Sequence, residues 1–222
     1  MFITFEGIEG SGKTSQVKHV ARFLQSRGLD CIVTREPGGT KIGRKIRAIL
    51  LDPENGNMNP AAELFLYMAD RAQHLNELIK PALGSGKTVL SDRYFDAALA
   101  YQGFARGVDT EFICRMHRFI FEDLKPDITI LLDLPSEIGL NRVWKQIRNG
   151  SRDILETRIE KEIISFHQKV RAGYLELASC EPDRFWIIDA SMDEDKVRKE
   201  IISRLESVIK QPLYGLSGQN GS

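Results

Sequence analysis

The sequence predicts an α/β fold in which a five-stranded parallel sheet is covered by helices on both faces. Two observations predict it: five short apolar runs, and longer stretches with helical periodicity between them. Strands that are apolar at nearly every position indicate a sheet buried on both sides. With 222 residues, 42% of them hydrophobic and 28% charged, the chain has the size and composition of one globular domain.

The strands are expected where apolar and β-branched residues follow one another without helical spacing. In chain order these runs are Phe2–Phe5, Cys31–Thr34, Thr88–Ser91, Ile128–Leu132 and Phe185–Ile188. The helices are expected where apolar residues recur every three or four positions. In chain order these stretches are Ser15–Ser26, Ala61–Leu83, Glu111–Leu124, Leu155–Ser179 and Glu194–Lys210. The domain therefore covers residues 1–210, and the stretch 211–222, rich in Gly, Ser and Asn, predicts a disordered tail.

A glycine-rich motif follows the first strand directly. It reads Gly7-Ile8-Glu9-Gly10-Ser11-Gly12-Lys13-Thr14 and fits G-x-x-x-x-G-K-[ST] at every fixed position. Glycines let the backbone N–H groups turn inward toward a polyphosphate, and the following helix adds its positive end. Lys13 is predicted to reach the β- and γ-phosphates, and the Thr14 hydroxyl to bind the bridging Mg²⁺. The motif predicts a site for ATP or GTP with magnesium; the alternative is a turn without a ligand.

A second Gly-Ser-Gly-Lys-Thr run occupies residues 84–88. Pro81 stands where the first glycine of the motif is required, and the run leads from a helix into a strand. Its amides would therefore not open a helix, so no helix dipole would point at a phosphate. We interpret this run as a turn that ends a helix.

Four arginines lie at strand ends or on helices that follow strands: Arg35, Arg47, Arg71 and Arg93. Ligands of open parallel sheets bind at that edge, and a guanidinium group grips phosphate through two hydrogen bonds. A single arginine of this kind is commonly a surface salt bridge, whereas four beside a phosphate loop favour a phosphate site. Asp92 precedes Arg93 and is expected to help to hold the magnesium. The pattern is typical of phosphoryl transfer.

The chain resembles thymidylate kinases of the bacterial type over about residues 1–210. The likeness is carried, in order, by the segments Phe5–Thr14, Arg35-Glu36-Pro37-Gly38-Gly39-Thr40, Ala69-Asp70-Arg71-Ala72-Gln73-His74, Asp92-Arg93-Tyr94 and Ala100-Tyr101-Gln102-Gly103. The resemblance implies the three-layer P-loop nucleoside monophosphate kinase fold. It also implies the reaction ATP + dTMP → ADP + dTDP, a step in dTTP synthesis, with Mg²⁺ and in a homodimer.

The resemblance assigns the phosphate-binding residues one by one. Glu9 corresponds to an acidic residue near the nucleotide sugar and the magnesium; the alternative is a solvated loop charge. Arg47 corresponds to the arginine that holds the dTMP phosphate. Arg93 corresponds to the arginine that spans the phosphates of both substrates, so it is expected to be catalytic together with Lys13.

The resemblance likewise assigns the residues around the nucleoside. Tyr67 and Arg71 are one helical turn apart and share a face. Tyr67 is implied to stack on thymine, unless it is a core residue, and Arg71 to bond a thymine carbonyl. Tyr101, followed by Gln102, is implied to crowd the 2′ position of the sugar and so to select deoxyribose.

A basic lid is implied at about residues 142–158. The phosphate loop contains no arginine, whereas Arg142, Lys145, Arg148 and Arg152 follow the fourth strand. They are expected to cover ATP, with Arg142 as an ATP-binding residue. Arg148 and Arg152 flank a flexible Asn-Gly-Ser turn, so they are the expected catalytic cations of the closed lid. The alternative is an exposed basic helix face.

Three features depart from the family pattern. Ala97 and Ala98 stand where polar residues near the base are usual, which predicts one hydrogen bond fewer to the nucleotide. Tyr67 replaces the more usual Phe and adds a hydroxyl that needs a partner. In the lid, Thr157-Arg158-Ile159-Glu160 replaces Asp-Arg-aromatic-Glu. None of these changes removes the phosphate chemistry.

Several functional classes are disfavoured. Lys+Arg and Asp+Glu both number 31, so no general affinity for nucleic acid or anionic membranes is expected. The apolar runs are too short to span a membrane, and a strand that begins at residue 2 leaves no room for a signal peptide, so a cytoplasmic protein is expected. No Asn-Lys-x-Asp motif of GTPases occurs. Two alternatives remain, another small-substrate P-loop kinase such as a nucleoside kinase, and a non-enzymatic nucleotide switch.

Overall fold

The predicted sheet is confirmed. The computed structural model describes residues 1–151 and 153–209. Five parallel strands lie in the order β2-β3-β1-β4-β5. Their bounds are β1 Phe2–Glu6, β2 Cys31–Arg35, β3 Thr88–Asp92, β4 Ile128–Asp133 and β5 Phe185–Asp189, each one residue longer than expected. Phe2 of β1 is level with Val89 of β3, and Ile3 with Ile128 of β4.

The strand order places a ligand site beside the central strand. From β1 the chain goes to β2, returns to β3, and then crosses to β4 on the other side of β1. The side of β1 on which successive strands are added therefore changes at this point. Open α/β sheets bind ligands at the carboxyl ends of the strands where this change occurs. The phosphate loop follows β1 directly, because α1 begins at Lys13.

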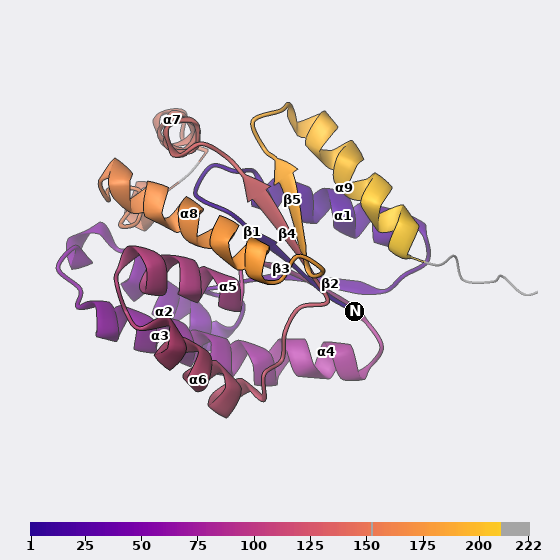
Figure 1. Ribbon diagram of the computed structural model, residues 1–222, viewed down its shortest axis with the longest axis horizontal. Coiled ribbons are helices and arrows are strands. Elements are labelled where there is room, and N and C mark those ends of the chain that lie inside the picture. The colour runs from indigo at the N-terminus through magenta and orange to yellow at the C-terminus, as the bar shows by residue number, and fades with distance from the viewer. Residues whose placement is uncertain (152, 210–222) are drawn as a thin grey trace, which may run out of the picture.

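Helices cover both faces of the sheet (Figure 1). On one face α1 and α9 lie side by side, and on the other face α8 and α5 pack, with α2, α3 and α6 gathered beyond them. The bounds are α1 Lys13–Ser26, α2 Lys41–Leu51, α3 Pro60–His74, α4 Lys80–Gly84, α5 Phe95–Ala98, α6 Thr110–Phe121, α7 Ser136–Arg148, α8 Ile164–Cys180 and α9 Glu194–Val208. Short helical turns η1 Pro53–Asn55 and η4 Ile154–Glu156 and the π-helices η2 Leu75–Ile79 and η3 Leu99–Ala105 complete the elements.

The helix expected over Ala61–Leu83 is present as α3, η2 and α4 in direct succession. The Gly-Ser-Gly-Lys-Thr run at 84–88 is a turn between α4 and β3, as predicted, and Gly86 adopts φ 79° there. The sequence reasoning did not predict α2, α5 or α7. Part of the expected lid is therefore helical, since α7 ends at Arg148.

The helix expected over Leu155–Ser179 is wrong at its start. Only the turn η4 forms near residue 155, and α8 begins at Ile164. Asp153 caps that turn through the Leu155 N–H at 2.8 Å, and Leu155 and Ile163 are exposed. Their apolar spacing thus does not mark a buried face, which is what the prediction assumed.

Apolar side chains fill the space on both faces of the sheet. One buried cluster joins β1 and β4 to α1, α8 and α9. A second joins α3, η2 and α6 around Phe2, Leu64 and Tyr94. Among the described residues, no helix combines the length and the apolar character needed to cross a membrane. The tail predicted at 211–222 lies outside the described residues.

Candidate active site

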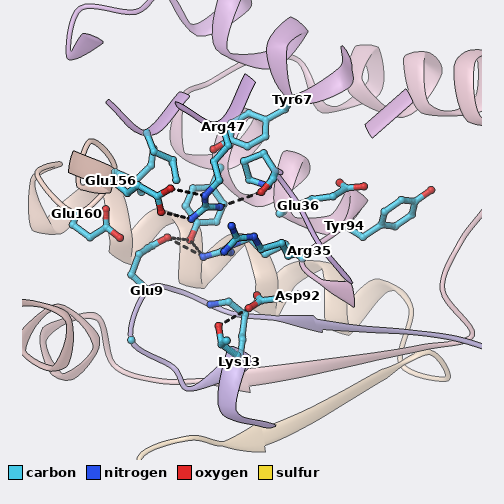
Figure 2. Close-up of a pocket in the computed structure, with 18 of the residues that line it drawn as sticks. Glu9, Lys13, Arg35, Glu36, Arg47, Tyr67, Asp92, Tyr94, Glu156 and Glu160 are labelled. Atoms are coloured by element: carbon cyan, nitrogen blue, oxygen red, sulfur yellow. Dashed lines mark hydrogen bonds and ion pairs between the residues drawn. The ribbon is translucent and has the colours of Figure 1, made fainter. Parts of the chain in front are cut away.

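A cleft of about 490 Å³ opens at the carboxyl ends of β1, β2 and β3 (Figure 2). Its walls come from the phosphate loop, the ends of β2 and β3, α2, α3, η3 and residues within 146–151 and 156–160. It brings together most of the residues predicted from the sequence: Glu9, Gly10, Gly12, Lys13, Thr14, Arg47, Tyr67, Arg71, Asp92, Arg93, Tyr101 and Gln102. The remaining phosphate-loop residues are Gly7, Ile8 and Ser11, which contact the Lys13 side chain instead.

Two glycines of the phosphate loop, Gly7 and Gly10, are required by close approach to neighbouring backbone. A Cβ on Gly10 would lie 2.2 Å from the Gly139 carbonyl oxygen on α7, and one on Gly7 would lie 2.5 Å from the Leu132 carbonyl oxygen. Both residues also have positive φ, at 73° and 133°. The loop lies so close to β4 and α7 that no side chain fits at Gly7 or Gly10.

Lys13 lies across this loop. Its Nζ donates to the carbonyl oxygens of Gly7 at 2.9 Å and Ile8 at 2.7 Å. Burial, followed by the nearby Arg93 charge, lowers the pKa of Lys13 to about 8. An anionic phosphate in the loop would oppose both effects, so the site is electrostatically prepared for one.

Thr14 and Asp92 meet at the mouth of the loop. The Thr14 hydroxyl donates to Asp92 Oδ2 at 2.7 Å, although the two residues are 78 positions apart. Within residues 1–151 and 153–209, no cluster of three or more His, Cys, Asp or Glu side chains is suited to hold a metal. One hydroxyl and one carboxylate are the kind of sparse protein set that Mg²⁺ uses when substrate phosphates and water supply its other ligands.

Arg93 sits in the centre of the site. Its Nη1 donates to the Gly7 carbonyl at 2.9 Å and to Tyr174 Oη at 3.0 Å. Its Nη2 donates to Glu9 Oε1 and Tyr101 Oη, both at 2.9 Å. Arg93 has φ 72°, a left-handed backbone that is unusual for a residue with a side chain and common at functional sites. The backbone is held by the bond from Arg93 N–H to the Phe5 carbonyl at 3.0 Å.

Glu9 is buried beside Arg93, so the alternative of a solvated loop charge is wrong. Tyr101 Oη donates to Glu9 Oε1 at 2.6 Å, and His167 Nδ1 on α8 lies 3.3 Å from Glu9 Oε2. Burial by itself raises the pKa of Glu9, but the adjacent His167 and the Arg93 charge outweigh it and hold this pKa well below the usual range. Sequence reasoning missed His167, because no local signal connects it with a loop 158 residues away.

Arg47 and Arg35 form the basic end of the cleft. Arg47 makes two bonds to Glu156, from Nε to Oε1 at 2.9 Å and from Nη2 to Oε2 at 2.7 Å. Its Nη1 donates to the Pro37 carbonyl at 3.1 Å. Burial, followed by the Arg47 charge, lowers the pKa of Arg35. The sequence analysis did not single out Glu156, since nothing in the local pattern distinguishes it from other surface acids.

Tyr67 and Arg71 line the cleft from the same face of α3, as their spacing predicts. Arg71 is buried and donates from Nε to Glu36 Oε2 at 2.8 Å and from Nη2 to the Tyr94 carbonyl at 2.9 Å. The second oxygen of Glu36 lies 2.9 Å from His74 Nδ1. Glu36 therefore holds the Arg71 guanidinium group in position. The sequence reasoning named both motifs but not this contact between them.

Tyr101 and Gln102 lie in the π-helix η3. Tyr101 reaches Glu9 and Arg93, as described above, whereas Gln102 Nε2 donates to Glu63 Oε1 at 2.8 Å. Glu63 is also paired with Arg158 Nη1 at 2.7 Å, and both side chains are buried. Ala97 and Ala98 line the cleft, and their side chains carry no polar group that could bond to a nucleotide.

The expected lid cations occupy different places. Arg142 donates to the Ala190 carbonyl at 3.0 Å and lies 3.5 Å from the Gly10 carbonyl, so it borders the phosphate loop. Arg148 is exposed at the end of α7 and is not among the described residues that line the cleft. The catalytic role of Arg148 stays a prediction. Arg152 lies outside the described residues.

Comparisons with known proteins agree with this geometry. A family model described as Thymidylate kinase matches residues 5–201. The chain is 52% identical over 208 residues to a thymidylate kinase of Desulfosudis oleivorans, covering 94% of this chain and 97% of that one. It is 52% identical over 216 residues to a thymidylate kinase of Desulforapulum autotrophicum, covering 97% and 95%.

A solved structure agrees as well. The crystal structure of thymidylate kinase from Ehrlichia chaffeensis superposes with a TM-score of 0.72 at 31% identity, covering 92% of this chain and 98% of that one. The phosphate loop, the arginines around it and the similarity over nearly the whole chain point the same way. The chain belongs to the thymidylate kinase family.

Proposed function

We propose that the cleft is where the chain transfers the γ-phosphoryl group of Mg-ATP to dTMP, releasing dTDP and ADP. As a thymidylate kinase, the chain is a nucleoside monophosphate kinase that phosphorylates dTMP with ATP. One observation carries the assignment of this reaction to the cleft: Arg93 contacts the phosphate loop through Gly7 and the opposite wall through Tyr101. A cation in that position lies between a donor in the loop and an acceptor beside η3.

The donor side is the phosphate loop. We assign Lys13 to the β- and γ-phosphates, because its ammonium group already bonds to the carbonyls that line the loop. Arg142, which borders Gly10, is assigned to ATP binding. Thr14 and Asp92 would hold Mg²⁺, which supplies charge neutralisation between the phosphates when it is bound.

The acceptor side runs from Arg47 to Arg71. We assign Arg47 to the dTMP phosphate, Tyr67 to one face of thymine and Arg71 to a thymine carbonyl, in line with their positions on one wall. Tyr101 is fixed by Glu9 and Arg93, so it can reject a ribose 2′-hydroxyl by its bulk. A dTMP phosphate oxygen is already ionised at neutral pH, so positioning and charge neutralisation are expected to supply the rate enhancement without a general base.

A substrate panel tests this function. With Mg-ATP, ADP release should be fast with dTMP, slower with dUMP and absent with thymidine. The thymine methyl group adds about 1–3 kcal/mol of discrimination, so dUMP is disfavoured and not excluded. Faster turnover of thymidine would support a nucleoside kinase instead. Nucleotide binding without turnover of any acceptor would support a non-enzymatic switch.

We also propose that the protein works as a homodimer. The outer faces of α3 and α6 carry exposed apolar side chains, and Phe119 on α6 is 90% exposed. Phe65 on α3 and Phe112 and Ile120 on α6 are exposed as well. A face of this kind is typical of an interface between subunits. Light scattering should give twice the 25.1 kDa chain mass, and Phe119→Ser should shift the mass toward that of one chain. A monomeric parent at micromolar concentration would contradict the proposal.

A further inference from the structure

We propose that Glu156 is a built-in competitor of the acceptor phosphate. When no acceptor is bound, its carboxylate occupies the edge of Arg47 that the phosphate would use, and the phosphate must displace it. This inference rests on the proposed function, because it takes Arg47 as the arginine that holds the dTMP phosphate. Glu156, a residue of the expected lid, then has a role in acceptor selection, because displacing its carboxylate costs binding free energy.

The contact has the geometry of a phosphate complex. Glu156 Oε1 and Oε2 accept from Nε and Nη2 of Arg47 at 2.9 and 2.7 Å, two parallel bonds to one edge of the guanidinium group (Figure 2). Carboxylate and phosphate both match this fork. The Nη1 on the other side is engaged with the Pro37 carbonyl. Glu156 therefore already occupies the Nε and Nη2 edge of Arg47, the edge that here makes two parallel hydrogen bonds.

The surrounding charge explains why a carboxylate settles there. Arg35 lines the same cleft, and its pKa is lowered by burial and then by the Arg47 charge, while Glu156 acts in the opposite direction. Two like charges at one end of a cleft repel each other, and a counter-ion relieves that repulsion. Glu156 supplies one negative charge, whereas a phosphate monoester supplies nearly two at neutral pH.

The pair is weak enough to be displaced. The Arg47 side chain is 16% exposed and that of Glu156 is 37% exposed, so water screens the attraction. η4 is a three-residue turn on the stretch between α7 and α8, so Glu156 can leave Arg47 without disrupting a long helix. An acceptor without a phosphate does not contest the Arg47 edge and gains nothing from the loss of Glu156.

Calorimetry on the ATP-free protein tests the inference, with dTMP and thymidine as the two ligands. Glu156→Gln removes the charge from a partly exposed side chain and should tighten dTMP binding by about 1.5–5-fold, the range for ion pairs that water screens. Thymidine affinity should not change. Glu156→Asp keeps the charge and should bind dTMP more like the parent. Glu54→Gln, an exposed carboxylate on η1, makes the same change in net charge and should have no effect.

A double-mutant cycle ties the gain to Arg47. In an Arg47→Ala background, Glu156→Gln should no longer tighten dTMP binding. Equal or weaker dTMP binding by Glu156→Gln overturns the inference, as does an equal gain for thymidine or in the Arg47→Ala background. Any of these outcomes leaves the proposed function standing, provided that the parent binds dTMP and that Arg47→Ala weakens dTMP binding. A parent that does not bind dTMP overturns both.

Discussion

Arg71 offers the sharpest test of how the acceptor wall is built. Its side chain is 1% exposed and its partner Glu36 is 2% exposed, with Nε and Oε2 2.8 Å apart. Arg71→Ala would leave the Glu36 carboxylate buried beside His74, and would remove the hydrogen bond from Arg71 Nη2 to the Tyr94 carbonyl. The substitution is therefore expected to damage the fold as well as dTMP binding.

The magnitude follows from burial. Removing one partner of a buried ion pair costs about 3–5 kcal/mol, because the other charge stays desolvated. For a protein of this size that corresponds to a loss of about 6–20 °C in Tm. Arg47→Ala is the matched control, since its pair with Glu156 is partly exposed. That substitution should cost less than about 1 kcal/mol.

Urea unfolding followed by tryptophan fluorescence measures both variants, with Trp144 on α7 and Trp186 on β5 as probes. Adding Glu36→Gln to Arg71→Ala should recover part of the lost stability, because the stranded charge is then gone. In the protein that stays folded at low temperature, the dTMP KM should rise far more than the ATP KM. A stability loss for Arg71→Ala no larger than that of Arg47→Ala would refute the reasoning.

Three further predictions concern the rest of the site. Lys13→Ala should lower kcat by about 100–1000-fold with little change in the urea midpoint, since it removes a charge that faces the transferring phosphoryl group; parental kcat at saturating substrates would contradict that role. Arg148→Ala should lower kcat and kcat/KM by similar factors, on the order of 10–1000-fold, at nearly constant ATP KM, whereas an unchanged kcat would make Arg148 part of a solvated helix face. Burial, and then the nearby Asp96 charge, raises the pKa of Glu6 from 4.5 to about 8. The folded state then holds a proton that the unfolded chain releases between these values, so this group's contribution to stability falls as pH rises, by at most about 1.4 kcal/mol per pH unit. Glu6→Gln should therefore gain stability relative to the parent between pH 5 and 8, and a constant difference in unfolding free energy would be inconsistent with this.

Much of the fold was predictable because its signals are local. The apolar runs marked all five strands to within one residue, since buried parallel strands need apolar side chains on both faces. The phosphate loop was predictable because its glycines and Lys13 are consecutive in sequence. The helix prediction failed where apolar residues have helical spacing but are not buried. Leu155 and Ile163 have helical spacing, but both are exposed and precede α8.

The sequence by itself determined the α/β class, the phosphate loop and the group of arginines around it, because each is encoded in a short run of residues. Tertiary structure alone decided the partners: His167 beside Glu9, Glu36 behind Arg71, and Glu156 on Arg47. These partners lie 35 to 158 positions apart, and the order of the strands in the sheet brings them together. Periodicity reports which face of an element is buried, but it carries no information about which distant charge meets it there.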